Sequence, residues 1–109
     1  MKIEITDDNV RVSDLPELGE RQAANFQAEV SAALPARPGL IEVDLGRTAR
    51  VDSSGLGALV AVYDHAQQRN RGVTLRVVDP QPPVRQLLEL TRVHRIFPII
   101  QRDSLAVPA

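Results

Sequence analysis

The alternation of apolar and polar positions divides the chain into short strands and longer helices. Alternating runs cover residues 2–6 and 10–12, with turn-forming Asp7-Asp8-Asn9 between them, so the opening predicts an antiparallel hairpin. Runs at residues 40–45 and 73–78 predict two more strands. A last run at residues 96–100 contains Pro98, which cannot donate a ladder hydrogen bond and therefore confines that strand to a sheet edge.

Three segments have apolar residues at the three- and four-residue spacing of a helix. The first covers about residues 20–34 and ends at Pro35, the second runs from about Ser54 to Asn70 with Gly72 beyond it, and the third follows a proline-rich stretch at 80–83. Residues 14–19 predict a loop because Pro16 and Gly19 interrupt any regular element. Helices that alternate with strands predict an α/β sheet with parallel crossovers.

Composition narrows the class of protein. The 109 residues suit one domain, 1–109, with a tail after about residue 101 that predicts no element and leaves room for flexibility. Cysteine is absent, the formal net charge is −1, and only three aromatic residues occur, which argues against thiolate metal sites and nucleic-acid binding. No signal peptide and no apolar run of about 20 residues is present, so we expect a soluble, cytoplasmic protein without membrane insertion.

The stretch Arg50-Val51-Asp52-Ser53-Ser54-Gly55-Leu56-Gly57 lies where a strand-like run gives way to a helical pattern. Aspartate and serine cap helix N-termini by accepting hydrogen bonds from unpaired N–H groups, and a helix N-terminus also favours a phosphate. Two glycines in a first turn each cost roughly 1 kcal/mol relative to alanine. Two interpretations follow: the serines and glycines serve only capping and tight packing, or something approaches this turn, such as a phosphate on Ser53.

Other chemistry finds little support in the sequence. His65 and His94 have no second ligand at metal spacing, and neither a phosphate-binding loop nor a dinucleotide fingerprint occurs. Ser53, His65 and Asp44 supply the residue types of a hydrolase triad, but residue types without geometry are weak support for one. We therefore expect no catalytic residue, no metal and no cofactor in this chain.

Residues 40–100 resemble the STAS domain, named for sulphate transporters and anti-sigma factor antagonists. The resemblance is carried by Asp52-Ser53-Ser54-Gly55-Leu56-Gly57, by Asp44 ahead of it, by the strand at 73–78, and by Pro83-Val84-Arg85-Gln86-Leu87-Leu88 followed by Ile96-Phe97. It implies a mixed four- to five-stranded sheet with helices packed mainly on one face.

Small stand-alone members of that family act as anti-sigma factor antagonists in a partner switch. By that resemblance, the unphosphorylated chain binds an anti-sigma factor that is also a serine kinase, with ATP and magnesium held by the kinase. The kinase phosphorylates Ser53, with Ser54 as the second choice, and a metal-dependent phosphatase resets the switch. The implied partner surface comprises the motif residues Asp52, Ser53, Ser54, Gly55, Leu56 and Gly57 together with Glu17 and Glu20.

The chain departs from the antagonist pattern at one position. Gly19 stands where the family's Gly-Glu-Leu-Asp-like stretch has an aspartate on the kinase-facing surface, and Glu20 is the nearest substitute. The alternative function is a STAS subunit of an ABC lipid transporter that binds its ATPase. An esterase that uses Ser53 ranks third, and it alone would make the chain an enzyme.

Overall fold

The computed structural model describes residues 1–102, so the expectation about the tail lies almost wholly outside the described residues. Eleven elements follow one another in chain order: β1 (Lys2–Thr6), β2 (Asn9–Ser13), β3 (Glu17–Leu18), α1 (Glu20–Ala33), β4 (Leu40–Asp44), β5 (Arg50–Val51), α2 (Ser53–Arg69), β6 (Thr74–Val78), α3 (Pro82–Leu90), the 3₁₀ turn η1 (Val93–Arg95) and β7 (Ile99–Ile100). The predicted strands and helices are all present within a few residues of their expected bounds.

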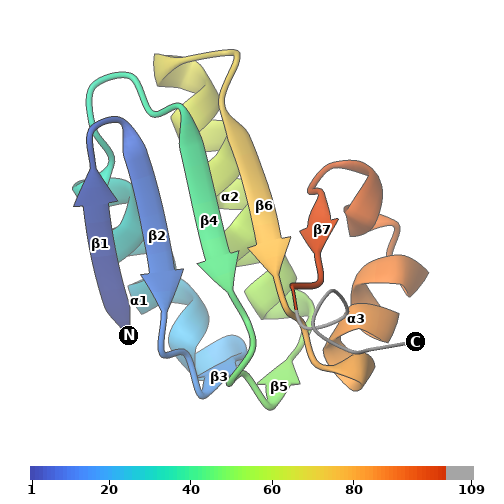
Figure 1. Ribbon diagram of the computed structural model, residues 1–109. Helices are drawn as coiled ribbons and strands as arrows, with labels where there is room; N and C mark the ends of the chain where they lie inside the picture. The colour runs from blue at the N-terminus through green and yellow to red at the C-terminus, as the bar shows by residue number, and fades with distance from the viewer. Residues whose placement is uncertain (103–109) are drawn as a thin grey trace.

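Five strands form the main sheet in the order β1-β2-β4-β6-β7 (Figure 1). β1 and β2 form the predicted antiparallel hairpin, whereas the β2–β4, β4–β6 and β6–β7 pairs are parallel. The register aligns Val10 with Ile41 and Ile41 with Leu75, which places apolar side chains of three neighbouring strands in one row. The sheet is therefore mixed and five-stranded, as the family resemblance implied.

The core lies between this sheet and the two long helices. The inward side chains of β2, β4 and β6 are at most 1% exposed, and α1 adds Phe26 and Val30 while α2 adds Leu59 and Val62. Figure 1 shows α1 and α2 on the same side of the sheet, behind β1, β2, β4 and β6. Burial on one face only explains why the strands alternate between apolar and polar residues.

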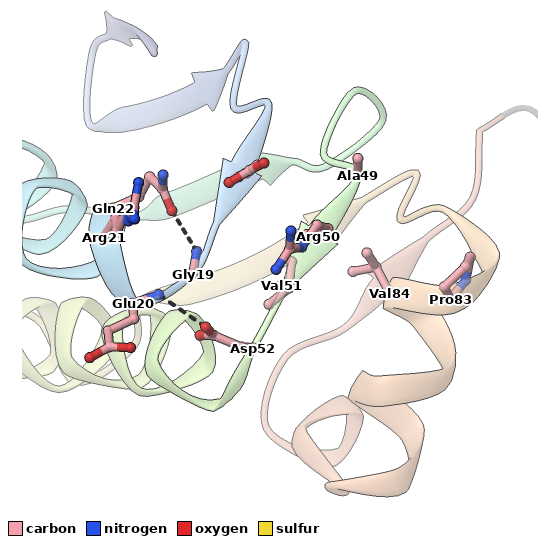
Figure 2. A pocket seen from close by; sticks show the side chains of 11 residues that line it. Gly19, Glu20, Arg21, Gln22, Ala49, Arg50, Val51, Asp52, Pro83 and Val84 are labelled. Atoms are coloured by element: carbon pink, nitrogen blue, oxygen red, sulfur yellow. Dashed lines mark hydrogen bonds between the residues drawn. The ribbon is translucent and has the colours of Figure 1, made fainter.

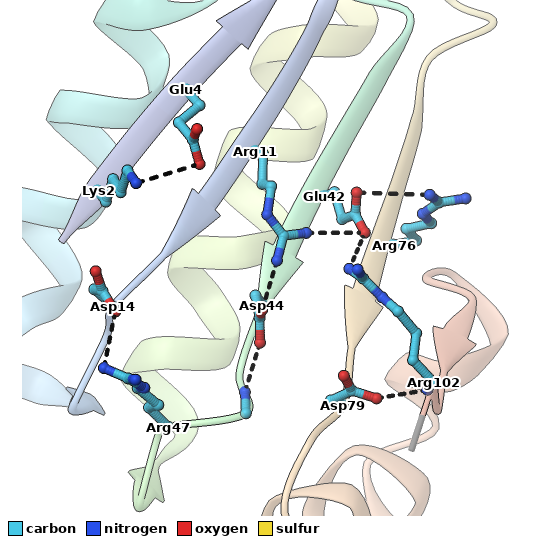
Figure 3. Close-up of polar contacts among 11 residues, drawn as sticks. Lys2, Glu4, Arg11, Asp14, Glu42, Asp44, Arg47, Arg76, Asp79 and Arg102 are labelled. Atoms are coloured by element: carbon cyan, nitrogen blue, oxygen red, sulfur yellow. Dashed lines mark hydrogen bonds and ion pairs between the residues drawn. The ribbon is translucent and has the colours of Figure 1, made fainter. Parts of the chain in front are cut away.

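The opposite face of the sheet carries a network of ion pairs centred on Glu42 (Figure 3). Glu42 accepts from Arg11 at 3.2 Å, Arg76 at 3.5 Å and Arg102 at 2.5 Å, and Arg11 also reaches Asp44 at 2.7 Å. These side chains come from the neighbouring strands β2, β4 and β6 and from Arg102, the second residue after β7. The network accounts for the charged positions of these strands.

Two short strands were not predicted. β3 lies inside the expected loop at 14–19, and β5 pairs with it in a separate parallel ladder, Glu17 with Arg50 and Leu18 with Val51. Two-residue strands are too short to show periodicity, and the tight turn after Asp44 separates β5 from β4. The apolar run from Leu40 to Val51 is thus two strands in two sheets.

The last strand is shorter than expected. The chain after α3 first forms η1, because the N–H groups of Ile96 and Phe97 both donate to the Val93 carbonyl. Phe97 is fully buried and meets the ring of Tyr63 edge-on, with ring centroids 5.3 Å apart. Pairing begins only at Ile99, after Pro98, and β7 occupies the sheet edge, as the proline predicted.

Candidate functional site

The stretch Asp52-Ser53-Ser54-Gly55 forms the junction between β5 and the start of α2. Asp52 is the N-cap of α2, and its Oδ1 accepts a hydrogen bond from the Gly55 N–H at 3.0 Å. Ser53 and Ser54 are therefore the first two residues of the helix, which starts one residue earlier than predicted. Of the three capping residue types in this stretch, the aspartate is the cap, and the Ser53 residue is left exposed.

Asp52 also caps the start of α1. Its Oδ2 accepts a hydrogen bond from the Glu20 N–H at 3.0 Å, and Gln22 Oε1 accepts from the Gly19 N–H at 3.0 Å (Figure 2). The bond from Gly55 is the main cause that holds the pKa of Asp52 below its usual range. Desolvation opposes this effect, and the Glu20 N–H and the positive charge of Arg50 reinforce it. One carboxylate thus serves two helix N-termini.

The two glycines of the motif have different surroundings. A Cβ added to Gly55 would lie 1.9 Å from the Leu18 carbonyl oxygen, so this glycine lets α2 pack directly against the β3 backbone. A Cβ added to Gly57 would meet nothing within 4 Å, and Gly57 is exposed. Tight packing therefore explains Gly55, and no contact within residues 1–102 requires Gly57.

The fold brings part of the expected partner surface together. Glu17, Glu20 and Asp52 all line one groove of about 690 Å³, between the start of α1 and the start of α3. Ser53 and Gly57 are exposed on α2 and do not line this groove, and Ser54 is half-buried. Gly55 is buried against β3, and Leu56 is only 6% exposed and belongs to the core.

Eight further residues line the groove. The sequence analysis named five of them without including them in the partner surface: Gly19, Arg50, Val51, Pro83 and Val84. It missed Arg21, Gln22 and Ala49. Arg21 and Arg50 put two cations beside the three carboxylates, and Figure 2 shows the start of α3 across the groove from β5. The pairing of β3 with β5 brings these segments together, and no local pattern in the sequence signals that pairing.

The three residues of the hydrolase triad considered from the sequence do not come together in the fold. Ser53 and His65 lie on one α-helix, twelve residues and so about 18 Å apart along its axis. Asp44 is held by Arg11 and by the Gly46 N–H, so these three residues form no triad. Within residues 1–102, no group of three or more acidic or histidine side chains is arranged to hold a metal ion, and no helix has the length and apolar character to cross a bilayer.

Solved structures with the same fold include regulators and a transporter protein. A putative anti-sigma factor antagonist from Thermotoga maritima is 24% identical, with a TM-score of 0.78 over 96% of this chain and 89% of that one. The anti-sigma factor antagonist SpoIIAA is 17% identical in its unphosphorylated form, with a TM-score of 0.75 over 96% and 91% of the chains. Its phosphorylated form, described as a Bacillus cell fate determinant, gives a TM-score of 0.65 over 96% and 95%.

A sulfate transporter family protein from Wolinella succinogenes is 12% identical and gives a TM-score of 0.71 over 92% of this chain and 83% of that one. No curated protein matches the sequence. The family model described as "Mlab, STAS domain" matches residues 1–101. That match covers almost all of the sequence and agrees with the five-stranded mixed sheet: the chain belongs to the STAS domain family.

Proposed function

We propose that this chain is an anti-sigma factor antagonist controlled by phosphorylation of Ser53. The observation that carries the proposal is the placement of Ser53: it is exposed at the first position of α2, directly after Asp52, which lines a groove with Glu17 and Glu20. In its unphosphorylated form the chain binds an anti-sigma factor serine kinase through this surface and displaces the sigma factor. Phosphorylation of Ser53 releases the kinase.

The chemistry of the helix start suits such a switch. A phosphate adds about −1.5 to −2 charges, and the N–H groups and dipole at the start of α2 make that charge tolerable within the folded domain. At a packed interface the same charge must lose its hydration and face the partner's groups. Each tenfold loss of affinity needs only about 1.4 kcal/mol, so a local clash is sufficient and the fold need not change.

The structural neighbours support the same function. The anti-sigma factor antagonist SpoIIAA has been solved unphosphorylated and phosphorylated, and both forms share this fold. For this chain we infer a cytoplasmic switch in which the partner kinase holds ATP and magnesium. A metal-dependent serine phosphatase removes the phosphate, and the chain itself is the substrate of both enzymes.

Paired baits test the proposal. We expect the wild-type chain to capture an anti-sigma factor kinase from a lysate of its source organism and Ser53→Asp to capture at least tenfold less. Ser53→Asn is the matched control, since it has a similar size without the charge, and it should retain the kinase. Equal capture by Ser53→Asp and Ser53→Asn would contradict the switch.

Phosphate incorporation tests the choice of serine. Ser53 is exposed and Ser54 is half-buried in the first turn of α2, so the kinase has better access to Ser53. We expect Ser53→Ala to abolish incorporation and Ser54→Ala to retain it, with the site read by mass spectrometry. Phosphate found on Ser54 would move the switch by one residue.

A second candidate is a STAS subunit that binds the ATPase of an ABC lipid transporter. Position 19 favours it, because the expected kinase-facing aspartate is replaced by Gly19, and the Asp52 carboxylate lies against that glycine. A transporter ATPase captured equally by wild type and Ser53→Asp would select this function and would leave Ser53 as an ordinary first-turn residue.

A further inference from the structure

We propose that Asp52 transmits the charge state of Ser53 to the start of α1. A negative charge on Ser53 repels the Asp52 carboxylate and weakens its hydrogen bond from the Glu20 N–H, so the segment Glu17–Glu20 changes together with the serine. This inference rests on the proposed function, because it assumes that Ser53 receives the phosphate. It adds the start of α1 to the surface that phosphorylation changes, with Glu20 lying 32 residues before Asp52 in the chain.

The contacts make Asp52 the link between the two helices. Its Oδ1 accepts from Gly55 in α2 and its Oδ2 accepts from Glu20 in α1, each at 3.0 Å. α1 has no side-chain cap of its own because its N-cap is Gly19, which has no side chain to offer. Asp52 therefore supplies, from another element, an acceptor for the N–H of the first residue of α1.

Gly19 also provides the room for this arrangement. A Cβ at position 19 would lie 3.0 Å from Asp52 Oδ2, which is closer than most real Cβ contacts, and at an ordinary 3.5 Å from its Cγ. An aspartate at this position would bring a second carboxylate against the first. The glycine that departs from the antagonist pattern thus leaves room for the Asp52 carboxylate, which caps α1 from a distant part of the same chain.

A phosphate on Ser53 competes with the Asp52 carboxylate for the N–H groups at the start of α2. Both groups lie at the start of α2 and are attracted by its first N–H groups, and two like charges on adjacent residues repel. The bond to Glu20 is the easier of the two to give up, because it is exposed and water can replace the carboxylate. The bond to Gly55 lies within the same turn and is partly buried.

The surrounding charges do not supply another partner for the Glu20 N–H. The groove places Glu17 of β3, Glu20 and Arg21 of α1, and Arg50 of β5 around Asp52. Arg50 is the cation that acts on the Asp52 carboxylate. The two glutamates only increase the repulsion, so the released N–H turns to water.

Amide resonances measured by NMR on the full chain test the coupling. A Glu20→Gln background removes the nearest competing carboxylate. In that background we expect the amide of position 20 and the amide of Gly55 to titrate with one common midpoint, and Asp52→Asn to abolish both titrations. An amide of position 20 that does not follow Asp52 would overturn the proposal.

The charge at position 53 is then varied with the matched pair Ser53→Glu, which is negative, and Ser53→Gln, which is neutral. We expect Ser53→Glu to move the amide of position 20 toward its Asp52→Asn position and to raise its exchange with water at least threefold, while Ser53→Gln leaves both unchanged. Ser53→Asp and Ser53→Asn form a second pair, and a thermal melt of each variant checks that it is folded.

Different outcomes would overturn the coupling through Asp52 and the proposed partner switch. If Ser53→Glu weakens binding of the kinase but leaves the amide of position 20 unchanged, the coupling is overturned and the switch stands. If that amide responds and kinase binding does not, the coupling is confirmed and the proposed function is overturned.

Discussion

Gly55 and Gly57 lie two residues apart in α2, yet alanine should have opposite effects on stability at these positions. Neither glycine has a positive φ angle, so backbone conformation distinguishes neither of them. Helix propensity alone favours alanine over glycine by about 0.5–1 kcal/mol. The difference between them therefore comes from what a Cβ would meet.

At Gly55, a Cβ would lie 1.9 Å from the Leu18 oxygen, 2.9 Å from its carbonyl carbon and 3.1 Å from its Cγ. The first two atoms belong to the backbone, so no rotamer change relieves the clash and α2 must move away from β3. Overpacking of this kind costs about 1–3 kcal/mol and sometimes more. A 1.9 Å approach to a backbone oxygen lies at the upper end of that cost, so after the gain in helix propensity we expect Gly55→Ala to lower the free energy of unfolding by about 2 kcal/mol or more.

At Gly57 the added methyl group meets nothing, so Gly57→Ala should raise the free energy of unfolding by about 0.5–1 kcal/mol. Urea unfolding followed by circular dichroism measures the free energy of unfolding of both variants. In a thermal melt, at roughly 4 °C per kcal/mol for a domain of this size, the melting temperature should fall for Gly55→Ala and rise for Gly57→Ala. A stabilising Gly55→Ala, or two equal changes, would refute the close contact between α2 and β3.

Three further predictions concern the supports of the site. Thr48 is fully buried and its hydroxyl donates to the Leu15 carbonyl at 2.5 Å, so Thr48→Val should cost about 1–3 kcal/mol in urea unfolding, and Thr48→Ser, which keeps the hydroxyl, should cost less. Phe97→Ala should cost about 3–5 kcal/mol because it empties a fully buried site, whereas Tyr63→Phe keeps the ring contact and should change little. The pKa of Asp52 is lowered in the folded state, so its stabilising effect is complete above the unfolded pKa of about 3.9 and is lost as the pH falls through the lower folded value. Wild type should therefore exceed Asp52→Asn in stability at neutral pH, with a gap that narrows below about pH 4; a gap that is constant down to pH 2 would contradict the shift.

Much of the fold could be predicted because the sheet is buried on one face only. Val10 and Val12, then Ile41 and Val43, alternate with polar residues, and this pattern identifies strands without knowledge of their partners. The pairing of Glu17–Leu18 with Arg50–Val51 could not be predicted, because two residues have no periodicity. That ladder depends on contacts between distant loops, such as the bond from Thr48 to Leu15.

The site was predicted as a stretch of sequence but not as a surface. Capping chemistry correctly placed the turn before α2, yet it did not show that Asp52 would also bind the Glu20 N–H across 32 residues of sequence. The glycines could not be distinguished either, since the reason for Gly55 is the Leu18 backbone and that contact exists only in the folded chain. Leu56 looked like part of the motif surface and lies in the core.

The central claim is that phosphate on Ser53 controls binding of an anti-sigma factor kinase. The most direct test is calorimetric titration of that kinase, once captured, with the wild-type chain before and after phosphorylation by the kinase itself. The account predicts that phosphorylation raises the Kd at least tenfold while the melting temperature shows that the chain stays folded. Equal affinity of the two forms would contradict it.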